Sequence, residues 1–146
     1  MEQYSSFFLH AGGVFVSNEP FHVHTILGSC ISVCLWDGKN KIAAMNHFMI
    51  SHCNDGDLTC KYGNVSLEHM LSEIKKFSNS PLKAYIIGGS NNPLLNPVVP
   101  TQNIEIADSF LRKHRIPIHL RDVGGSMSRK IVFNTMSGEV SIIKGR

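Results

Sequence analysis

Two apolar segments joined by a short turn constrain the fold of this chain more than any other feature. The first runs from Cys30 to Trp36 and the second from Lys41 to Ile50, with Asp37-Gly38-Lys39-Asn40 between them. Asp-Gly between apolar runs is typical of a β-hairpin turn. We therefore expect the two segments to pair as antiparallel strands.

Alternation along an extended chain sorts the first segment into two faces. One face would carry Cys30, Ser32, Cys34 and Trp36, and the other Ile31, Val33 and Leu35. A helical turn beginning near Gly28-Ser29 is the alternative, because so short a run does not reveal its period.

Further strands and two helices are predicted around this hairpin. Short apolar runs bounded by Gly, Pro or Asn predict strands at 14–16, 21–27, 82–87, 116–122, 130–135 and 139–143, the last two joined across Ser137-Gly138. Apolar stripes at helical spacing predict helices at 64–77 and 103–116, with Asn64 and Asn103 as their N-caps. The polar stretches 52–63 and 90–102 are predicted to be loops.

Hairpins near both ends of the chain indicate antiparallel or mixed sheets and argue against a doubly wound parallel sheet. We expect an α+β fold, a layered sandwich of mixed or antiparallel β-sheets with two main helices on an outer face. The length of 146 residues fits one domain over 1–146.

Composition narrows the environment and the partners. No apolar run approaches the roughly 20 residues of a membrane span, and Met1-Glu2-Gln3-Tyr4 lacks the features of a signal peptide. We expect a cytoplasmic protein without membrane insertion, whose four cysteines stay reduced. The net charge of +3 is dispersed and small. Its two clusters, 75–76 and 112–115, fall at predicted helix ends, where cations complement the macrodipole, and do not indicate nucleic-acid binding.

A thiol and an imidazole are the candidate catalytic groups. Cys30 ends the Gly28-Ser29 turn, where glycine permits a backbone that exposes the thiol and directs nearby N–H groups at an oxyanion. His47 lies on the opposite arm of the predicted hairpin, which folds it back toward Cys30. A thiol and an imidazole that lie close together are the minimum catalytic groups of a cysteine hydrolase. A buried, inert cysteine and a core histidine are the alternative interpretation.

A third group is needed to orient the imidazole through its other ring nitrogen. Thr25, His24 and Asn46 are the candidates, and the sequence does not choose among them.

The other polar clusters in the sequence do not predict a functional site. The positions His52, Cys53, Cys60 and His69 match no structural zinc pattern, so no metal or other cofactor is expected. Gly88-Gly89 and Gly124-Gly125 follow strands without forming a nucleotide-binding motif. Asp122 and Arg129 are expected to form a structural ion pair.

The segments Leu27-Gly28-Ser29-Cys30 and Met45-Asn46-His47-Phe48-Met49 resemble the active-site signature of the CheD family, the chemoreceptor glutamine deamidases. The resemblance continues through Tyr62-Gly63, Gly88-Gly89, Asn103, Asp122-Val123-Gly124-Gly125, Arg129-Lys130 and Phe133.

The resemblance implies a cysteine hydrolase, related in fold to deamidating toxins, that converts selected receptor glutamines to glutamate. It implies Cys30 as nucleophile, His47 as base, and receptor helices and a CheC-type phosphatase as partners. The family's third catalytic residue is a threonine shortly before the glycine turn. By strict count that position falls on His24, next to Thr25.

The sequence departs from the family pattern at Tyr85-Ile86-Ile87, Val99-Pro100-Thr101-Gln102 and Ser128. These departures lie away from Cys30 and His47 and concern the partner surface. A module that docks on a receptor or phosphatase without catalysis is therefore the second hypothesis, and a metal-binding sensor using residues 52–69 is the third.

Overall fold

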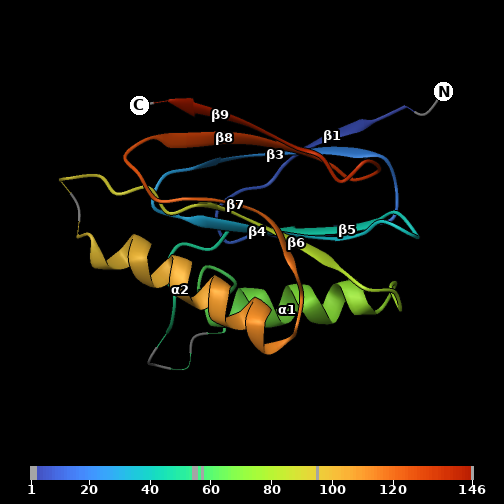
Figure 1. The fold of residues 1–146 in the computed structure, drawn as a ribbon, viewed down its shortest axis with the longest axis horizontal. Coiled ribbons are helices and arrows are strands. Elements are labelled where there is room, and N and C mark those ends of the chain that lie inside the picture. The colour runs from blue at the N-terminus through green and yellow to red at the C-terminus, as the bar shows by residue number, and fades with distance from the viewer. Residues whose placement is uncertain (1–2, 54–55, 57, 95, 146) are drawn as a thin grey trace.

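The computed structural model describes residues 3–53, 56, 58–94 and 96–145, and these residues form three layers. Two β-sheets stack face to face, and two helices cover the outer face of one of them (Figure 1). The α+β class, with mixed sheets and two helices on an outer face, is confirmed.

The four-stranded sheet has the order β1-β3-β8-β9. Its strands are β1 (Ser5–Phe8), β3 (Phe21–Leu27), β8 (Ser128–Asn134) and β9 (Val140–Gly145). The β1–β3 pair is parallel and the other pairs are antiparallel. The predicted hairpin across Ser137-Gly138 is thus confirmed, whereas β1 was not predicted.

The five-stranded sheet has the order β2-β5-β4-β6-β7. Its strands are β2 (Val14–Ser17), β5 (Ile42–Asn46), β4 (Ile31–Asp37), β6 (Lys83–Gly88) and β7 (Ile118–Val123). The β4–β5 hairpin is antiparallel, as predicted, and β6–β7 is parallel.

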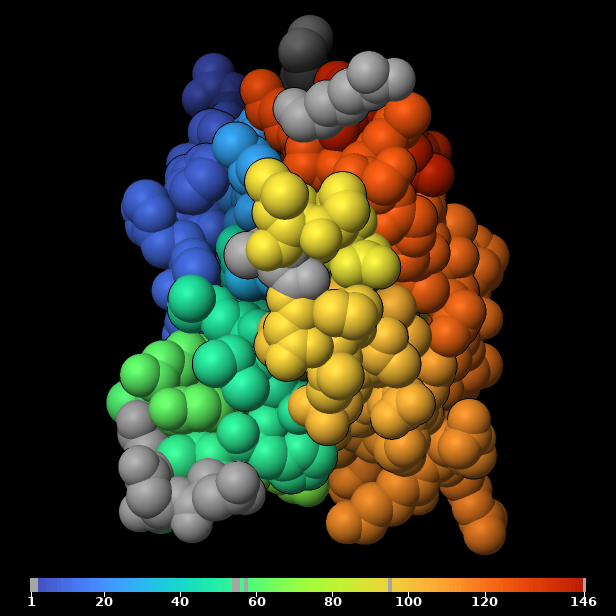
Figure 2. All heavy atoms as spheres, turned by 90° about the vertical axis from the view of Figure 1, so that its left-hand side faces the viewer, coloured from blue at the N-terminus to red at the C-terminus, as the bar shows by residue number. Residues whose placement is uncertain are grey.

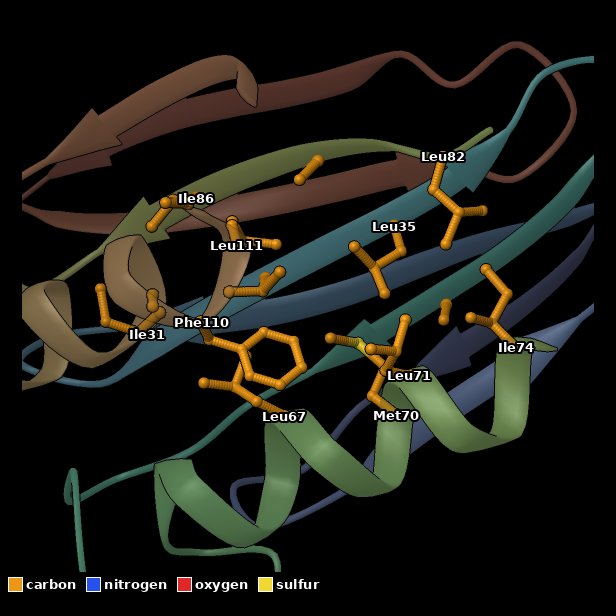
Figure 3. Packing of buried hydrophobic residues seen from close by; sticks show 14 of the residues in the cluster. Ile31, Leu35, Leu67, Met70, Leu71, Ile74, Leu82, Ile86, Phe110 and Leu111 are labelled. Atoms are coloured by element: carbon orange, nitrogen blue, oxygen red, sulfur yellow. The ribbon is translucent and has the colours of Figure 1, made fainter. Parts of the chain in front are cut away.

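Two apolar clusters hold the layers together. One fills the space between the helices and the five-stranded sheet and includes Leu67, Leu111, Ile31 and Leu35 (Figure 3). The other lies between the two sheets and includes Cys34 and Trp36, with Cys30 packed against it. The predicted alternation along this strand is therefore confirmed, and the helical alternative at Gly28-Ser29 is wrong.

The strand predicted over 41–50 ends early, at Asn46. The Asn46 side-chain oxygen accepts the Val33 N–H at 2.7 Å, where a regular ladder would use a backbone carbonyl. His47 instead exchanges backbone hydrogen bonds with Gly12 and Gly13, and an isolated bridge joins Ile31 to Phe48. The interruption frees His47 from the β4–β5 ladder.

Both predicted helix caps are wrong. Helix α1 covers Gly63–Lys75 and is preceded by Tyr62, which makes no side-chain cap bond. Helix α2 covers Val98–Lys113, so the predicted loop 90–102 ends earlier than expected. Proline is tolerated in a first helical turn because its missing N–H has no intrahelical partner there, so Pro100 did not prevent the early start.

The predicted loops 52–63 and 90–102 include positions 54, 55, 57 and 95, which lie outside the described residues. Within the described part of the chain, no helix combines the length and apolar character needed to cross a bilayer.

Candidate active site

The candidate site lies where the chain crosses from one sheet to the other. Thr25 is on β3 of the four-stranded sheet, Cys30 directly precedes β4 of the five-stranded sheet, and the turn 28–30 connects them. His47 follows β5. The register places His47 on the same face of its sheet as Cys30, toward the space between the sheets.

Thr25 and His47 are in direct contact across the two sheets. The Thr25 Oγ1 atom lies 2.8 Å from His47 Nδ1, and its hydroxyl donates to the Leu9 carbonyl at 2.7 Å. A threonine hydroxyl has one proton. Because that proton is directed to Leu9, Thr25 accepts a hydrogen bond from Nδ1–H, which leaves Nε2 of the neutral ring with a free lone pair.

The other candidates for the third group point elsewhere. His24 alternates with Thr25 along β3 and so faces the outside of the four-stranded sheet. The Asn46 amide donates to Ser66 of α1 on the helix side of the five-stranded sheet. Of the three residues that the sequence left open, Thr25 is the one that contacts the imidazole.

Cys30 and His47 are diagonal neighbours in the interrupted β4–β5 pairing. The bridge between Ile31 and Phe48 sets Cys30 opposite Met49 and places His47 opposite Ser32. The Cα atoms of such diagonal pairs lie about 7–8 Å apart in regular antiparallel sheets, within reach of long side chains. No hydrogen bond joins the Cys30 thiol to His47 among the described residues.

Burial keeps both groups neutral in the resting protein. It lowers the pKa of His47 to about 4, because the charged imidazolium loses solvation. It also raises the pKa of the Cys30 thiol, an effect that a hydrogen bond from the Cys30 backbone N–H partly offsets. The expected starting state is a thiol beside a neutral base.

The turn presents two backbone donors beside the sulfur. The carbonyls of Gly28 and Cys30 accept from Ser90 N and Gly89 N, both at 2.9 Å. Within the described part of the chain, the Ser29 and Cys30 N–H groups donate to no other residue. They are therefore available to a developing oxyanion.

Gly88 permits the close approach of β6 to this turn. Its φ is +116°, and an added Cβ would lie 2.3 Å from the Cys30 carbonyl oxygen. Its own carbonyl is one of several held by the guanidinium of buried Arg129. Arg129 also forms the expected ion pair with Asp122, at 3.1 Å.

Two hollows flank the turn. One of about 260 Å³ and one of about 490 Å³ share Ser29, Ser90 and Asn92 as walls. The smaller is closed by Val99 and Pro100 at the start of α2. Figure 2 looks onto this end of the molecule, where the segment after β6 (yellow) lies between the α2 start (gold) and the β7–β8 connection (orange). The hollows give an extended ligand room on either side of Ser29.

Sequence reasoning missed the role of Asn103. Its side-chain nitrogen donates to the carbonyls of Ser29 at 3.1 Å and Met49 at 2.9 Å. A signal was present, because Asn103 shares a helical face with Ala107 and Leu111, at i+4 and i+8. A polar residue within an apolar stripe indicates a buried hydrogen bond.

The third hypothesis, a metal-binding sensor using residues 52–69, finds no support in the part of the chain that the structure describes. Among the described residues, no group of three or more His, Cys, Asp or Glu side chains is placed to hold a metal ion. The His69 Nε2 atom lies 3.8 Å from Oε1 of Glu73 on the same helix. Cys34 is enclosed between the sheets, and burial raises the pKa of its thiol to about 12.

Comparison with known proteins finds similarity to proteins of one family. Residues 49–144 match a family model described as CheD chemotactic sensory transduction. A probable chemoreceptor glutamine deamidase CheD of Trichlorobacter lovleyi is 36% identical over 96% of this chain and 91% of the relative. The corresponding protein of Sulfurimonas denitrificans is 33% identical over 96% and 94%. That of Rhodospirillum rubrum is 32% identical over 92% and 80%.

Proposed function

Since this chain belongs to the CheD family, we propose that it hydrolyses selected glutamine side chains of chemoreceptors to glutamate, with release of ammonia. Cys30 is the nucleophile, His47 the general base and acid, and Thr25 the residue that orients His47. The observation that carries this proposal is the hydrogen-bonded chain from Leu9 through Thr25 to His47, which presents an unprotonated Nε2.

The first half-reaction forms a thioester. The Cys30 side chain rotates toward His47, Nε2 takes the thiol proton, and the sulfur attacks the carboxamide carbon of the substrate. The Ser29 and Cys30 N–H groups hold the resulting oxyanion, and one such donor is typically worth about 10²–10³ in rate. The C–N bond then breaks, and the imidazolium gives its proton to the departing ammonia.

The second half-reaction regenerates the thiol. His47 removes a proton from water, whose oxygen attacks the thioester carbon. The C–S bond then breaks, the sulfur recovers a proton from His47, and glutamate is released. Both halves need the same Nε2 lone pair, so the tautomer set by Thr25 serves the whole cycle.

The open geometry suits a protein substrate. The two hollows share Ser29, the residue before the proposed nucleophile, as a common wall. One methylene distinguishes glutamine from asparagine and is worth only about 1–3 kcal/mol in a pocket. Selectivity for particular receptor glutamines therefore comes mainly from docking of the surrounding receptor helix.

The location, the domain organisation, the fold relationship and a second partner belong to the same proposal. We propose a cytoplasmic, single-domain protein with kinship to the cysteine-hydrolase fold of deamidating toxins, and a CheC-type phosphatase as a further partner. Support comes from the family membership and from the sheet-crossing turn that carries Cys30.

Mass spectrometry of a receptor cytoplasmic domain tests the function. Wild-type protein should convert specific glutamines to glutamate, Cys30→Ala should convert none while staying folded, and Cys60→Ala should behave like wild type. Conversion by Cys30→Ala at the wild-type rate would contradict the proposal. Receptor binding without conversion by the wild type would replace hydrolysis with docking alone.

A further inference from the structure

Asn103 makes an unusual pair of contacts for a residue in the middle of a helix. It is fully buried in α2, yet its side chain bonds neither its own helix nor solvent. Both contacts start from one nitrogen, Nδ2, and both end on backbone carbonyls of other segments. The contacts therefore join three parts of the chain: α2, the nucleophile turn and the segment after β5.

The two carbonyls belong to the segments that carry the reacting groups. Ser29 O is the carbonyl of the peptide bond that leads into Cys30, and Met49 lies two residues beyond His47. The last backbone pairing between these segments is the Ile31–Phe48 bridge, with hydrogen bonds of 3.1 and 3.0 Å. Beyond it, among the described residues, the hydrogen bonds that join the nucleophile turn to the segment after His47 are those of Asn103.

An amide NH₂ group suits this connection because two carbonyl oxygens cannot bond each other. One nitrogen with two protons satisfies both acceptors and fixes their separation. The Asn103 Oδ1 atom is buried without a hydrogen-bond partner in the described part of the chain. The side chain thus retains a desolvated acceptor, a cost that its two donor bonds must offset.

The bond to Ser29 O also acts on the chemistry of the turn. A hydrogen bond to a carbonyl polarises the whole peptide group and strengthens its N–H as a donor. The N–H in question is that of Cys30, which lowers the pKa of the Cys30 thiol through a hydrogen bond and donates to no other described residue. Asn103 can thus affect the pKa of the Cys30 thiol through the Cys30 N–H, without contacting the sulfur.

We propose that Asn103 is a positioning residue of this active site. Its side-chain amide holds the Ser29–Cys30 peptide in register with the His47 segment, so that the Cys30 N–H faces the developing oxyanion. The inference rests on the proposed deamidase function and adds a residue of α2 to its machinery.

The test compares Asn103→Ala with Leu111→Ala, a buried residue about two turns further along the same helix that packs in the apolar cluster (Figure 3). Asn103→Ala should lower kcat for receptor deamidation roughly tenfold or more, because a displaced oxyanion donor loses part of its effect. KM should change less than about threefold, since the receptor surface is untouched. Leu111→Ala should reduce stability while kcat stays near wild type.

A second readout needs no substrate. Iodoacetamide labelling of Cys30 as a function of pH reports the sulfur directly. Asn103→Ala should move the labelling midpoint upward by roughly half a pH unit, because a weaker N–H donor stabilises the thiolate less. Leu111→Ala should leave the midpoint unchanged. This comparison decides the role of Asn103 even if the wild-type protein proves to have no deamidase activity.

The proposal is overturned if folded Asn103→Ala retains both wild-type kcat and the wild-type labelling midpoint. It is also overturned if Leu111→Ala lowers kcat and shifts the midpoint as much. Should Asn103→Ala fail to fold, Asn103→Ser replaces it, because a serine hydroxyl has one proton and can serve only one of the two carbonyls. The same outcomes then apply.

Discussion

Replacing Thr25 with valine isolates the hydrogen bond that sets the state of His47. Valine keeps the shape of threonine and removes the hydroxyl. The His47 Nδ1–H and the Leu9 carbonyl, now bonded at 2.8 and 2.7 Å, would both lose their partner. The preference for the Nδ1–H tautomer would disappear with the acceptor.

The magnitude follows from the cost of a buried, unpaired polar group, about 1–3 kcal/mol. If that energy is what favours the reactive tautomer, its loss corresponds to roughly a 5- to 150-fold fall in kcat. Thr25→Ser keeps the hydroxyl and should remain within about threefold of wild type. Deamidation of a receptor domain, followed as ammonia release, measures both.

Thr135 provides a matched control. It is also fully buried, donates its hydroxyl to the Glu19 carbonyl at 2.7 Å and accepts the Phe21 N–H at 2.9 Å. Thr135→Val therefore removes the same kind of bonds at the opposite end of β3. It should lower stability without lowering kcat. Wild-type kcat in Thr25→Val, or an equal loss of kcat in Thr135→Val, would contradict this role of the Thr25 hydroxyl.

Two further predictions concern stability. The folded-state pKa of His47, about 4 against 6.5 for a free imidazole, means that the unfolded chain binds its proton first as the pH falls. The free energy of unfolding should therefore decrease between about pH 6.5 and 4, by at most about 3 kcal/mol from this group. Urea titrations at several pH values measure this, and the unfolding free energy of His47→Asn should depend less steeply on pH than that of the wild type. Equal pH dependence in the two proteins would contradict the prediction. Gly88→Ala should destabilise the protein by at least about 1–3 kcal/mol, because Gly88 has a positive φ and approaches Cys30 closely. Gly145→Ala is the control, because an added Cβ there meets nothing within 4 Å, and it should change the thermal midpoint little. Similar thermal midpoints for the two variants would contradict the close approach of Gly88 to Cys30.

The sequence predicted the parts of the site that depend on local pattern. Strand alternation and the Asp37–Asn40 turn were sufficient to place Cys30 and His47 on arms of one hairpin. The choice of Thr25 over His24 needed the structure, because it depends on which face of β3 packs against the other sheet. Alternation along one strand separates the two residues but does not say which is inside.

The errors have physical causes as well. Asn103 was predicted to be a cap because asparagine is a preferred N-cap residue, and its bonds to Ser29 and Met49 join segments far apart in sequence. Residues 47–50 were predicted to continue a strand because they are apolar. The Asn46 side chain ends that strand by replacing a backbone acceptor, which an apolar pattern does not reveal.

The proposed mechanism depends on Thr25 holding His47 as a neutral base with its lone pair on Nε2. Ring-nitrogen NMR of His47 in the folded protein tests this most directly. The expected result is an Nδ1–H tautomer that is neutral at pH 7 and gains a proton only near pH 4. An imidazolium at pH 7, or a proton resting on Nε2, would contradict it.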